Sequence, residues 1–367
     1  MTPAKWQDRR VLVTGHTGFK GSWLSLLIAG MGAKVTGFAL DPSTDPNLFE
    51  AARIDELVTH RIGDVRDLGA VQQLFAKARP EIVFHLAAQS LVRPSYQQPV
   101  ETYATNVMGT AHVLEAARQL GGVKAIVCVT SDKCYENREW VWPYRESDPM
   151  GGHDPYSSSK GCAELVAAAY RSSFFDTAPT DDWTGLATVR AGNVIGGGDW
   201  AQDRLIPDII RALEAGAAPL IRSPQALRPW QHVLEALHGY LMIAERLLAG
   251  ERRYADAWNF GPSESDAQSV SNIVERLVAA LGGKGWETAA GDQPHEAGLL
   301  RLDSSKARAE LGWQPSLDLG EALDWIVEWH QVFARNQDAR AITQEQIRKY
   351  LVRSGSSLPR QAAKAAA

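Results

Sequence analysis

Short apolar runs alternate with longer segments of helical spacing along the first half of the chain. Each run is apolar nearly throughout. Such runs are typical of strands that lie in a parallel sheet covered on both faces by helices. The predicted strands lie at residues 10–14, 33–40, 57–62, 81–86, 123–130 and 185–190. The pattern therefore predicts an α/β fold, a Rossmann-type doubly wound parallel sheet, over residues 1–190.

The alternation loosens after residue 190. A glycine-rich loop at 191–200 is followed by predicted helices at 205–215 and 233–249, a strand at 257–260, and short helices and loops at 262–335. We expect a smaller, partly interleaved α/β substrate domain at 191–340, with the chain returning to the first domain around 230–260. The tail, residues 354–367, is low in complexity and is expected to be disordered.

Small or polar residues follow the predicted strands at their carboxyl ends. The residues at these ends are Gly15, Asp41, Asp64, Ala87 and Ser131. In parallel α/β sheets, ligands bind in the crevice beyond the carboxyl ends of the strands. The sequence therefore predicts that these five residues share one binding site.

The first strand ends in a glycine-rich turn, and a helical pattern follows. Gly15, Gly18 and Gly21 are spaced G-x-x-G-x-x-G. Glycines in this context let a pyrophosphate approach the backbone, where a helix N-terminus supplies unpaired N–H groups. Asp41 lies 20 residues after Gly21, the usual offset for an acid that binds the ribose of NAD and repels the extra phosphate of NADP. Asp41 could alternatively serve only as a turn cap before Pro42.

A second motif begins a later helix. Tyr156 and Lys160 are four residues apart, which places them on one helix face. A neighbouring ammonium favours the phenolate, so we expect Lys160 to lower the pKa of Tyr156 and make it a base for an alcohol proton. The alternative is a helix face with a half-buried tyrosine and a solvated lysine.

Composition excludes several classes of partner. The 367 residues carry a net charge of −5, which gives no reason to expect nucleic acid or an acidic membrane surface as a partner. No apolar run is long enough to span a membrane, and the N-terminus lacks the apolar segment of a signal peptide. The three cysteines are expected to be free thiols in a reducing, cytoplasmic compartment, and the histidines show no metal-ligand spacing.

Six motifs in order resemble the extended short-chain dehydrogenase/reductase family, over roughly residues 8 to 335. They are the glycine turn from Thr14 to Gly21, Asp64-Val65, Leu86-Ala87-Ala88, Asn106, Ser131, and Tyr156 with Lys160. The resemblance implies NAD as cofactor. It would be bound by Gly15, Thr17, Gly18, Phe19, Lys20, Gly21, Asp41, Asp64, Val65, Leu86, Ala87, Ala88, Tyr156 and Lys160.

Within that family the segment 130–135 resembles the nucleotide-sugar 4,6-dehydratases, because Asp132 follows the hydroxyl residue Ser131. Lys133 stands where members that act on dTDP-sugars carry glutamate and members that act on CDP-sugars carry lysine. Segments 14–23, 190–200 and 294–297 also resemble the CDP-sugar members. The resemblance therefore implies CDP-glucose as the small-molecule substrate and a place in deoxysugar biosynthesis, such as that of lipopolysaccharide O-antigen.

The resemblance also implies an internal redox cycle. Tyr156, helped by Ser131, takes the proton of the glucose 4-hydroxyl while hydride leaves C4. Asp132 then protonates the departing 6-hydroxyl, and the hydride returns to C6. Lys133 is either the base at C5 or a charged group that stabilises the enolate, and the sequence leaves both roles open. The rival functions are a nucleotide-sugar 4-epimerase, which needs no acid at C6, and a non-catalytic NAD-binding scaffold.

Substrate binding is expected mainly in the second half of the chain. Arginine suits a diphosphate, and the arginines at 190, 204, 222 and 228 are candidates. The predicted substrate residues are Gln89, Asn193, Arg204, Arg228 and His295. The resemblance further implies a homodimer or homotetramer, in which helices at 107–118 and 156–174 pair across a two-fold axis.

Overall fold

A computed structural model describes residues 3–179, 182–263, 266–289 and 299–356. Its centre is a seven-stranded sheet in the order β10-β6-β5-β4-β1-β2-β3, in which every neighbouring pair is parallel. The predicted fold class is confirmed. The strands are β1 (Arg10–Thr14), β2 (Lys34–Ala39), β3 (Thr59–Ile62), β4 (Ile82–His85), β5 (Ala125–Val129), β6 (Gly185–Ala191) and β10 (Ala257–Phe260).

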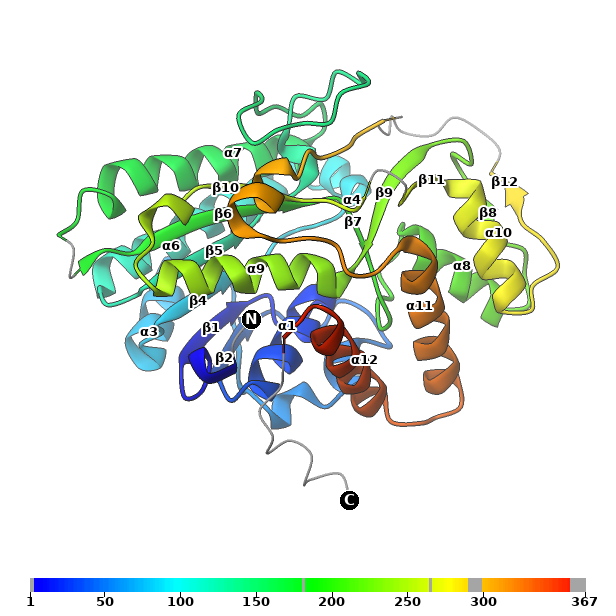
Figure 1. Cartoon of the computed structure of the whole chain (residues 1–367), viewed down its shortest axis with the longest axis horizontal. Coiled ribbons are helices and arrows are strands. Elements are labelled where there is room, and N and C mark those ends of the chain that lie inside the picture. The colour runs from blue at the N-terminus through cyan, green and yellow to red at the C-terminus, as the bar shows by residue number, and fades with distance from the viewer. Residues whose placement is uncertain (1–2, 180–181, 264–265, 290–298, 357–367) are drawn as a thin grey trace.

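Helices cover both faces of this sheet (Figure 1). Successive strand residues enter two separate cores: Val11 and Val13 pack with α1 (Phe19–Gly30) and α9 (Val233–Leu248), whereas Leu12 packs with the opposite layer. That layer consists of α3 (Leu68–Ala78), α6 (Gly109–Leu120) and α7 (Pro155–Tyr170). Because both faces are buried there, inner strands such as β4 and β5 are apolar nearly throughout, whereas the edge strand β3 is polar and mostly exposed.

A second lobe lies beside the sheet, where Figure 1 shows α8, α10 and α11 grouped together. Its core joins Ile195, Trp230 and apolar residues of these three helices. Short strands complete the lobe. Its elements are β7 (Asn193–Ile195), α8 (Leu205–Glu214), β8 (Leu220–Ile221), β9 (Leu227–His232), β11 (Ala267–Ser269), α10 (Val270–Ala280), β12 (Glu287–Thr288) and α11 (Leu319–Ala334).

Shorter helical segments connect these elements. They are α2 (Leu48–Ala51), α4 (Val92–Gln97), α5 (Pro99–Tyr103), the π-helical segments Ala104–Met108, Arg171–Phe175 and Ala307–Leu311, and the 3₁₀ segments Pro3–Lys5, Ile54–Glu56, Asp132–Cys134 and Arg252–Tyr254. Within the described ranges, no helix is long and apolar enough to cross a membrane.

The end of the chain is more regular than the sequence pattern predicted. Within 262–335, where short helices and loops were expected, α11 instead runs for 16 residues from a capping box formed by Asp318 and Glu321. Beyond that range, α12 (Ala339–Arg353) follows from an Asp338 cap. Arg340 of α12 donates to the carbonyl of Ala52 at 2.6 Å, so α12 packs on the first half of the chain. The predicted loop 191–200 contains β7. Residues 357–367 of the predicted disordered tail lie outside the described residues.

Candidate active site

One cavity of about 720 Å³ lies at the carboxyl ends of the sheet strands and is lined from both lobes. It brings together every predicted site residue in the described part of the chain except the candidate Arg190, whereas His295 and the segment 294–297 lie outside the described residues. The lining includes Gly15, Thr17, Gly18, Phe19, Lys20, Gly21, Asp41, Asp64, Val65, Leu86, Ala87, Ala88, Gln89, Ser131, Asp132, Lys133, Tyr156, Lys160, Asn193, Arg204 and Arg228.

The glycine turn packs too closely against neighbouring backbone to admit larger residues. Gly15 has φ +76°, and a Cβ there would lie 2.7 Å from the backbone nitrogen of Ala87. A Cβ on Gly21 would lie 2.1 Å from the Gly15 carbonyl oxygen. Helix α1 begins after Gly18 without a side-chain cap, so its first N–H groups are available to a phosphate. These observations fit the pyrophosphate of a dinucleotide.

The two acids near this cradle differ in their surroundings. Asp41 follows β2 and lies exposed at the cavity, as a ribose ligand would. Asp64 also lines the cavity, but its carboxylate accepts from the Nε of Arg66 at 2.8 Å, and these hydrogen bonds hold the pKa of Asp64 below its ordinary value. Asp64 is therefore already paired within the protein.

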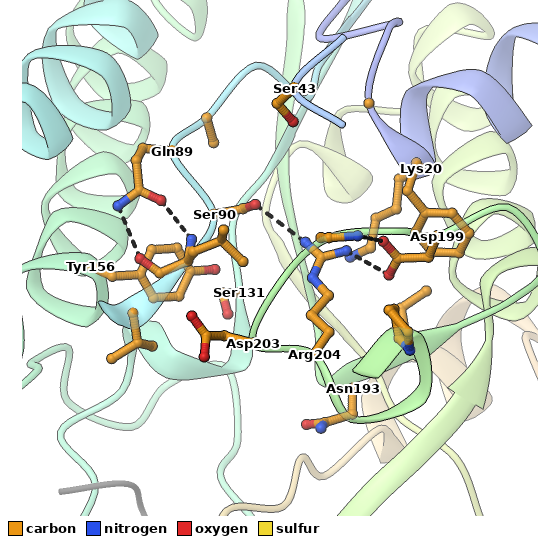
Figure 2. Close-up of a pocket in the computed structure, with 18 of the residues that line it drawn as sticks. Lys20, Ser43, Gln89, Ser90, Ser131, Tyr156, Asn193, Asp199, Asp203 and Arg204 are labelled. Atoms are coloured by element: carbon orange, nitrogen blue, oxygen red, sulfur yellow. Dashed lines mark hydrogen bonds and ion pairs between the residues drawn. The ribbon is translucent and has the colours of Figure 1, made fainter. Parts of the chain in front are cut away.

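The loop after β4 is fixed by a buried asparagine. Asn106 accepts from the backbone N–H of Gln89 and donates to the Gln89 carbonyl, both at 2.9 Å, and it donates to Ser159 of α7 at 2.8 Å. The side-chain amide of Gln89, labelled in Figure 2, is hydrogen-bonded to the backbone of Leu91 and to the hydroxyl of Thr102. Gln89 therefore lines the cavity with its amide already engaged inside its own loop.

Tyr156 and Lys160 are both buried in the first two turns of α7, which Asp154 caps. Burial raises the pKa of Tyr156 to about 12, although a hydrogen bond with Ser131 lowers it in part. The prediction that Lys160 lowers the pKa of Tyr156 below its ordinary value is wrong for this structure, because the cost of burying a phenolate outweighs the favourable contacts. Lys160 donates to the Val129 carbonyl at 3.3 Å, and burial lowers its own pKa to about 8.

The Ser131 segment forms a tight turn. Ser131 caps the 3₁₀ turn Asp132–Cys134 by accepting from the backbone N–H of Lys133 at 3.2 Å, and its hydroxyl donates to Asp132 at 3.0 Å. Burial raises the pKa of Asp132, against a smaller lowering by the charge of Lys133. A raised pKa is what a carboxyl group needs to serve as a general acid.

Four arginines were candidates for binding a diphosphate, and three of them line the cavity. Arg204 is held by Asp199 at 2.8 Å and by the hydroxyl of Ser90 at 3.2 Å (Figure 2). Arg222 donates to Asp203 at 3.4 Å. Arg190 does not line the cavity but is buried in a bidentate ion pair with Glu164. The expectation that Arg190 is available to a diphosphate is therefore wrong.

Sequence reasoning missed Ser90, Asp199, Asp203 and Glu164. Only Glu164 left a signal, because it is four residues after Lys160 and so on the same helix face. The contacts of Ser90, Asp199 and Asp203 join the loop after β4 to the segments around α8, and no spacing in the sequence predicts such pairs.

The family follows from comparison with known proteins. A family model described as GDP-mannose 4,6 dehydratase matches residues 12–325, and the chain belongs to this family. Over 348 residues the chain is 55% identical to the CDP-glucose 4,6-dehydratase of Salmonella typhimurium, covering 94% of this chain and 97% of that protein.

Solved structures of lower identity show the same fold. The dTDP-glucose 4,6-dehydratase of Streptomyces venezuelae, with NAD and TYD bound, is 24% identical with a TM-score of 0.75, over 90% of this chain and 99% of its own. The UDP-glucose 4-epimerase of Thermotoga maritima, with UDP-glucose, is 22% identical with a TM-score of 0.76, over 88% of this chain and 99% of its own. Dehydratases and epimerases share this architecture, so the fold alone does not separate the two activities.

Proposed function

We propose that this protein catalyses the NAD-dependent 4,6-dehydration of CDP-glucose to CDP-4-keto-6-deoxyglucose, with internal hydride transfer from C4 to C6. The observation that carries the proposal is Asp132, a buried carboxyl with a raised pKa that lines one cavity with Ser131, Tyr156 and Lys160. The 55% identity to a CDP-glucose 4,6-dehydratase supports the choice of nucleotide. We assign residues 1–190, together with the return of the chain around 230–260 that supplies α9 and β10, to a cofactor domain, and the rest of 191–340 to a substrate domain.

The residues around the glycine turn hold NAD in this proposal. Gly15 and Gly21 allow the tight turn that places the start of α1 at the pyrophosphate, and Asp41 accepts from the ribose hydroxyls. The other cofactor residues are those predicted from the sequence. When bound, NAD accepts the hydride and later returns it, and its oxidised ring adds a positive charge that favours the Tyr156 phenolate.

Tyr156 takes the proton of the 4-hydroxyl, and Ser131, which is hydrogen-bonded to Tyr156, relays it. The 4-ketone acidifies the proton at C5. Asp132 gives its proton to the departing 6-hydroxyl, which leaves as water. A buried, protonated Asp132 can do this because the loop offers it a hydroxyl donor but no bidentate cation.

Lys133 is half-buried in the cavity wall and serves the C5 step, as the base or as a charged group that stabilises the enolate. Lys133→Arg separates the two roles, because arginine keeps the charge but does not act as a base. Arg204 and Arg228 bind the diphosphate, and Gln89, Asn193 and His295 complete the substrate set.

A 4-epimerase is the second candidate, because an epimerase shares the fold at a TM-score of 0.76. The deciding experiment incubates the purified protein separately with CDP-glucose, dTDP-glucose, GDP-mannose and UDP-glucose, without added NADH. We expect mass spectrometry to show loss of one water from CDP-glucose alone. Loss from another sugar nucleotide would overturn the CDP assignment, and conversion of UDP-glucose to UDP-galactose without loss of mass would overturn the dehydratase.

We also propose a homodimer, or a homotetramer built from it, formed through α6 and α7. The support is a set of exposed apolar side chains on and next to these helices, namely Met108, Leu165 and Phe174. Leu165→Glu is expected to reduce the mass measured by light scattering, whereas an unchanged mass would exclude this face. The three unpaired cysteines support a cytoplasmic location, and the product class supports a role in deoxysugar biosynthesis, such as that of O-antigen.

A further inference from the structure

A buried ion pair between α7 and β6 lies next to the proposed reacting groups. One of its partners belongs to the helix that carries Tyr156 and Lys160, and both contact the segment that carries Ser131, Asp132 and Lys133. Glu164 lies four residues after Lys160 on α7, and it faces Arg190 of β6. The Arg190 Nε and Nη2 each donate to the carboxylate at 2.8 Å, and both side chains are about 5% exposed or less. Neither residue lines the cavity, so the pair acts on the site only through other groups.

The pair contacts both ends of the segment 130–135. At one end, the hydroxyl of Thr130 donates to the Glu164 carboxylate. At the other end, Arg190 donates to the hydroxyl of Tyr135 at 2.6 Å and lies 4.9 Å from the centre of its ring. Tyr135 in turn donates to Asn259 of β10 at 2.8 Å. Ser131, Asp132 and Lys133 lie between these two fixed points.

We propose that the Glu164–Arg190 pair is a positioning element that sets the Ser131–Lys133 segment at a fixed distance from Tyr156 and Lys160. The inference rests on the proposed function, because it assigns the pair a role in that reaction. The Glu164 carboxylate accepts a hydrogen bond from Thr130, which directly precedes Ser131, and Glu164 belongs to the helix that carries Tyr156. A shift of Glu164 or Arg190 therefore moves the proton donor Asp132 relative to the base Tyr156. A misplacement of about 1 Å far from the chemistry can cost about 10²-fold in rate.

The pair also acts on the charge of Lys160. Burial lowers the pKa of Lys160 to about 8, and Cys128, Glu164 and Cys134 each raise it in part. Lys20 and His85 also interact with this ammonium. Removing the charge of Glu164 takes away one of the groups that keep Lys160 protonated.

Two threonines provide a matched test. Thr130 and Thr188 each donate a hydroxyl hydrogen bond to Glu164, Thr188 at 2.7 Å, but only Thr130 belongs to the segment that carries Ser131. We expect Thr130→Val to lower kcat by about 10²-fold with KM and NAD affinity unchanged. Thr188→Val is expected to lower the unfolding free energy by a similar amount. Its kcat is expected to stay within about twofold of the wild type, because Thr188 is not next to a residue that takes part in the reaction. Equal kcat values for the two variants would overturn the proposal.

The pH profile supplies a second readout, which a loss of stability alone would not move. Glu164→Gln is expected to shift the basic limb of the rate of C4 oxidation, a step that does not use the Asp132 proton, to lower pH, since Lys160 loses its proton more readily. Thr188→Val is expected to leave that limb in place, and an unshifted limb in folded Glu164→Gln would count against the proposal. Should Glu164→Gln fail to fold, the threonine comparison decides.

Wild-type turnover is measured first, so that failure of the proposed function is seen separately. If the wild type epimerises a sugar nucleotide instead, the same kcat ratio of the threonine variants is measured on that reaction, which also uses Ser131 and Tyr156.

Discussion

Asp132 and Glu164 are equally buried carboxyl groups in two adjoining regions, and their environments push their pKa values in opposite directions. In the cavity wall, burial dominates and raises the pKa of Asp132. In the layer between α7 and β6, burial also raises the pKa of Glu164, but the charge and hydrogen bonds of Arg190 outweigh it and the net shift is downward.

The difference lies in the partners rather than in the depth of burial. Glu164 accepts two hydrogen bonds from Arg190 and one from each of two threonine hydroxyls, which satisfies an ionised carboxylate. Asp132 accepts a hydroxyl hydrogen bond from Ser131, while Lys133, Lys20 and Arg228 act on it through their charges. The first arrangement suits a fixed ion, and the second suits a group that gives and regains a proton.

The largest expected effect is on catalysis at Asp132. Asp132→Asn removes the proton donor and is expected to lower kcat for water loss by about 10²- to 10⁴-fold. Oxidation at C4 does not need this proton, so NADH should accumulate on the enzyme during a single turnover, as seen by its absorbance. A variant that loses water at the wild-type rate would show that Asp132 is not the acid.

The next effect is on stability at Glu164. Glu164→Ala leaves Arg190 charged and unpaired in a buried layer, which is expected to cost about 3–5 kcal/mol of unfolding free energy. Denaturant titration measures it. The double variant Glu164→Met/Arg190→Met is expected to recover much of this loss, because no unpaired charge remains. A loss below about 1 kcal/mol in the single variant would mean that solvent, or the remaining hydrogen bonds of Arg190 to Tyr135 and to the Glu146 carbonyl, compensate its charge.

The pH dependence of stability is expected to have opposite signs at the two sites. Because the folded-state pKa of Glu164 is lowered, its stabilisation is present above the unfolded pKa of about 4.3 and is lost as pH falls through the folded value. Because the folded-state pKa of Asp132 is raised, ionised Asp132 destabilises the fold, and stability is regained as pH falls through the folded value.

Two substitutions test these signs. Asp132→Asn is therefore expected to stabilise the protein at neutral pH, and Glu164→Gln to destabilise it. Both differences should shrink in acid, as followed by unfolding midpoints across pH. Changes of the unfolding midpoint with the same sign in the two variants would contradict the opposite pKa shifts of Asp132 and Glu164.

The smallest effect is expected at an exposed pair, which serves as the reference for the buried one. Lys349 and Glu328 are 3.4 Å apart and both about two-fifths exposed. Lys349→Ala is expected to change the unfolding free energy by less than about 1 kcal/mol, because solvent screens the pair. A larger loss would show that exposure does not separate the two kinds of ion pair in this protein.

The sequence predicted the sheet and most of the cavity wall because both follow from local patterns. Apolar runs mark strands, and parallel strands bring their ends together, so Gly15, Asp41 and Ser131 could be placed in one site. Pairing between distant segments was not predictable in this way. Arg190 looked like a phosphate ligand because the sequence does not show that Glu164 faces it. The pKa of Tyr156 was misjudged because burial, which outweighs a neighbouring charge, is a property of the fold.

CDP-glucose that carries deuterium at C4 tests the internal hydride transfer and the loss of water assisted by Asp132. The purified protein, without added NADH, is expected to release a product that has lost one water and holds the deuterium at C6. A dehydrated product without deuterium would contradict internal transfer, and a deuterated product with no loss of water would contradict the dehydration itself.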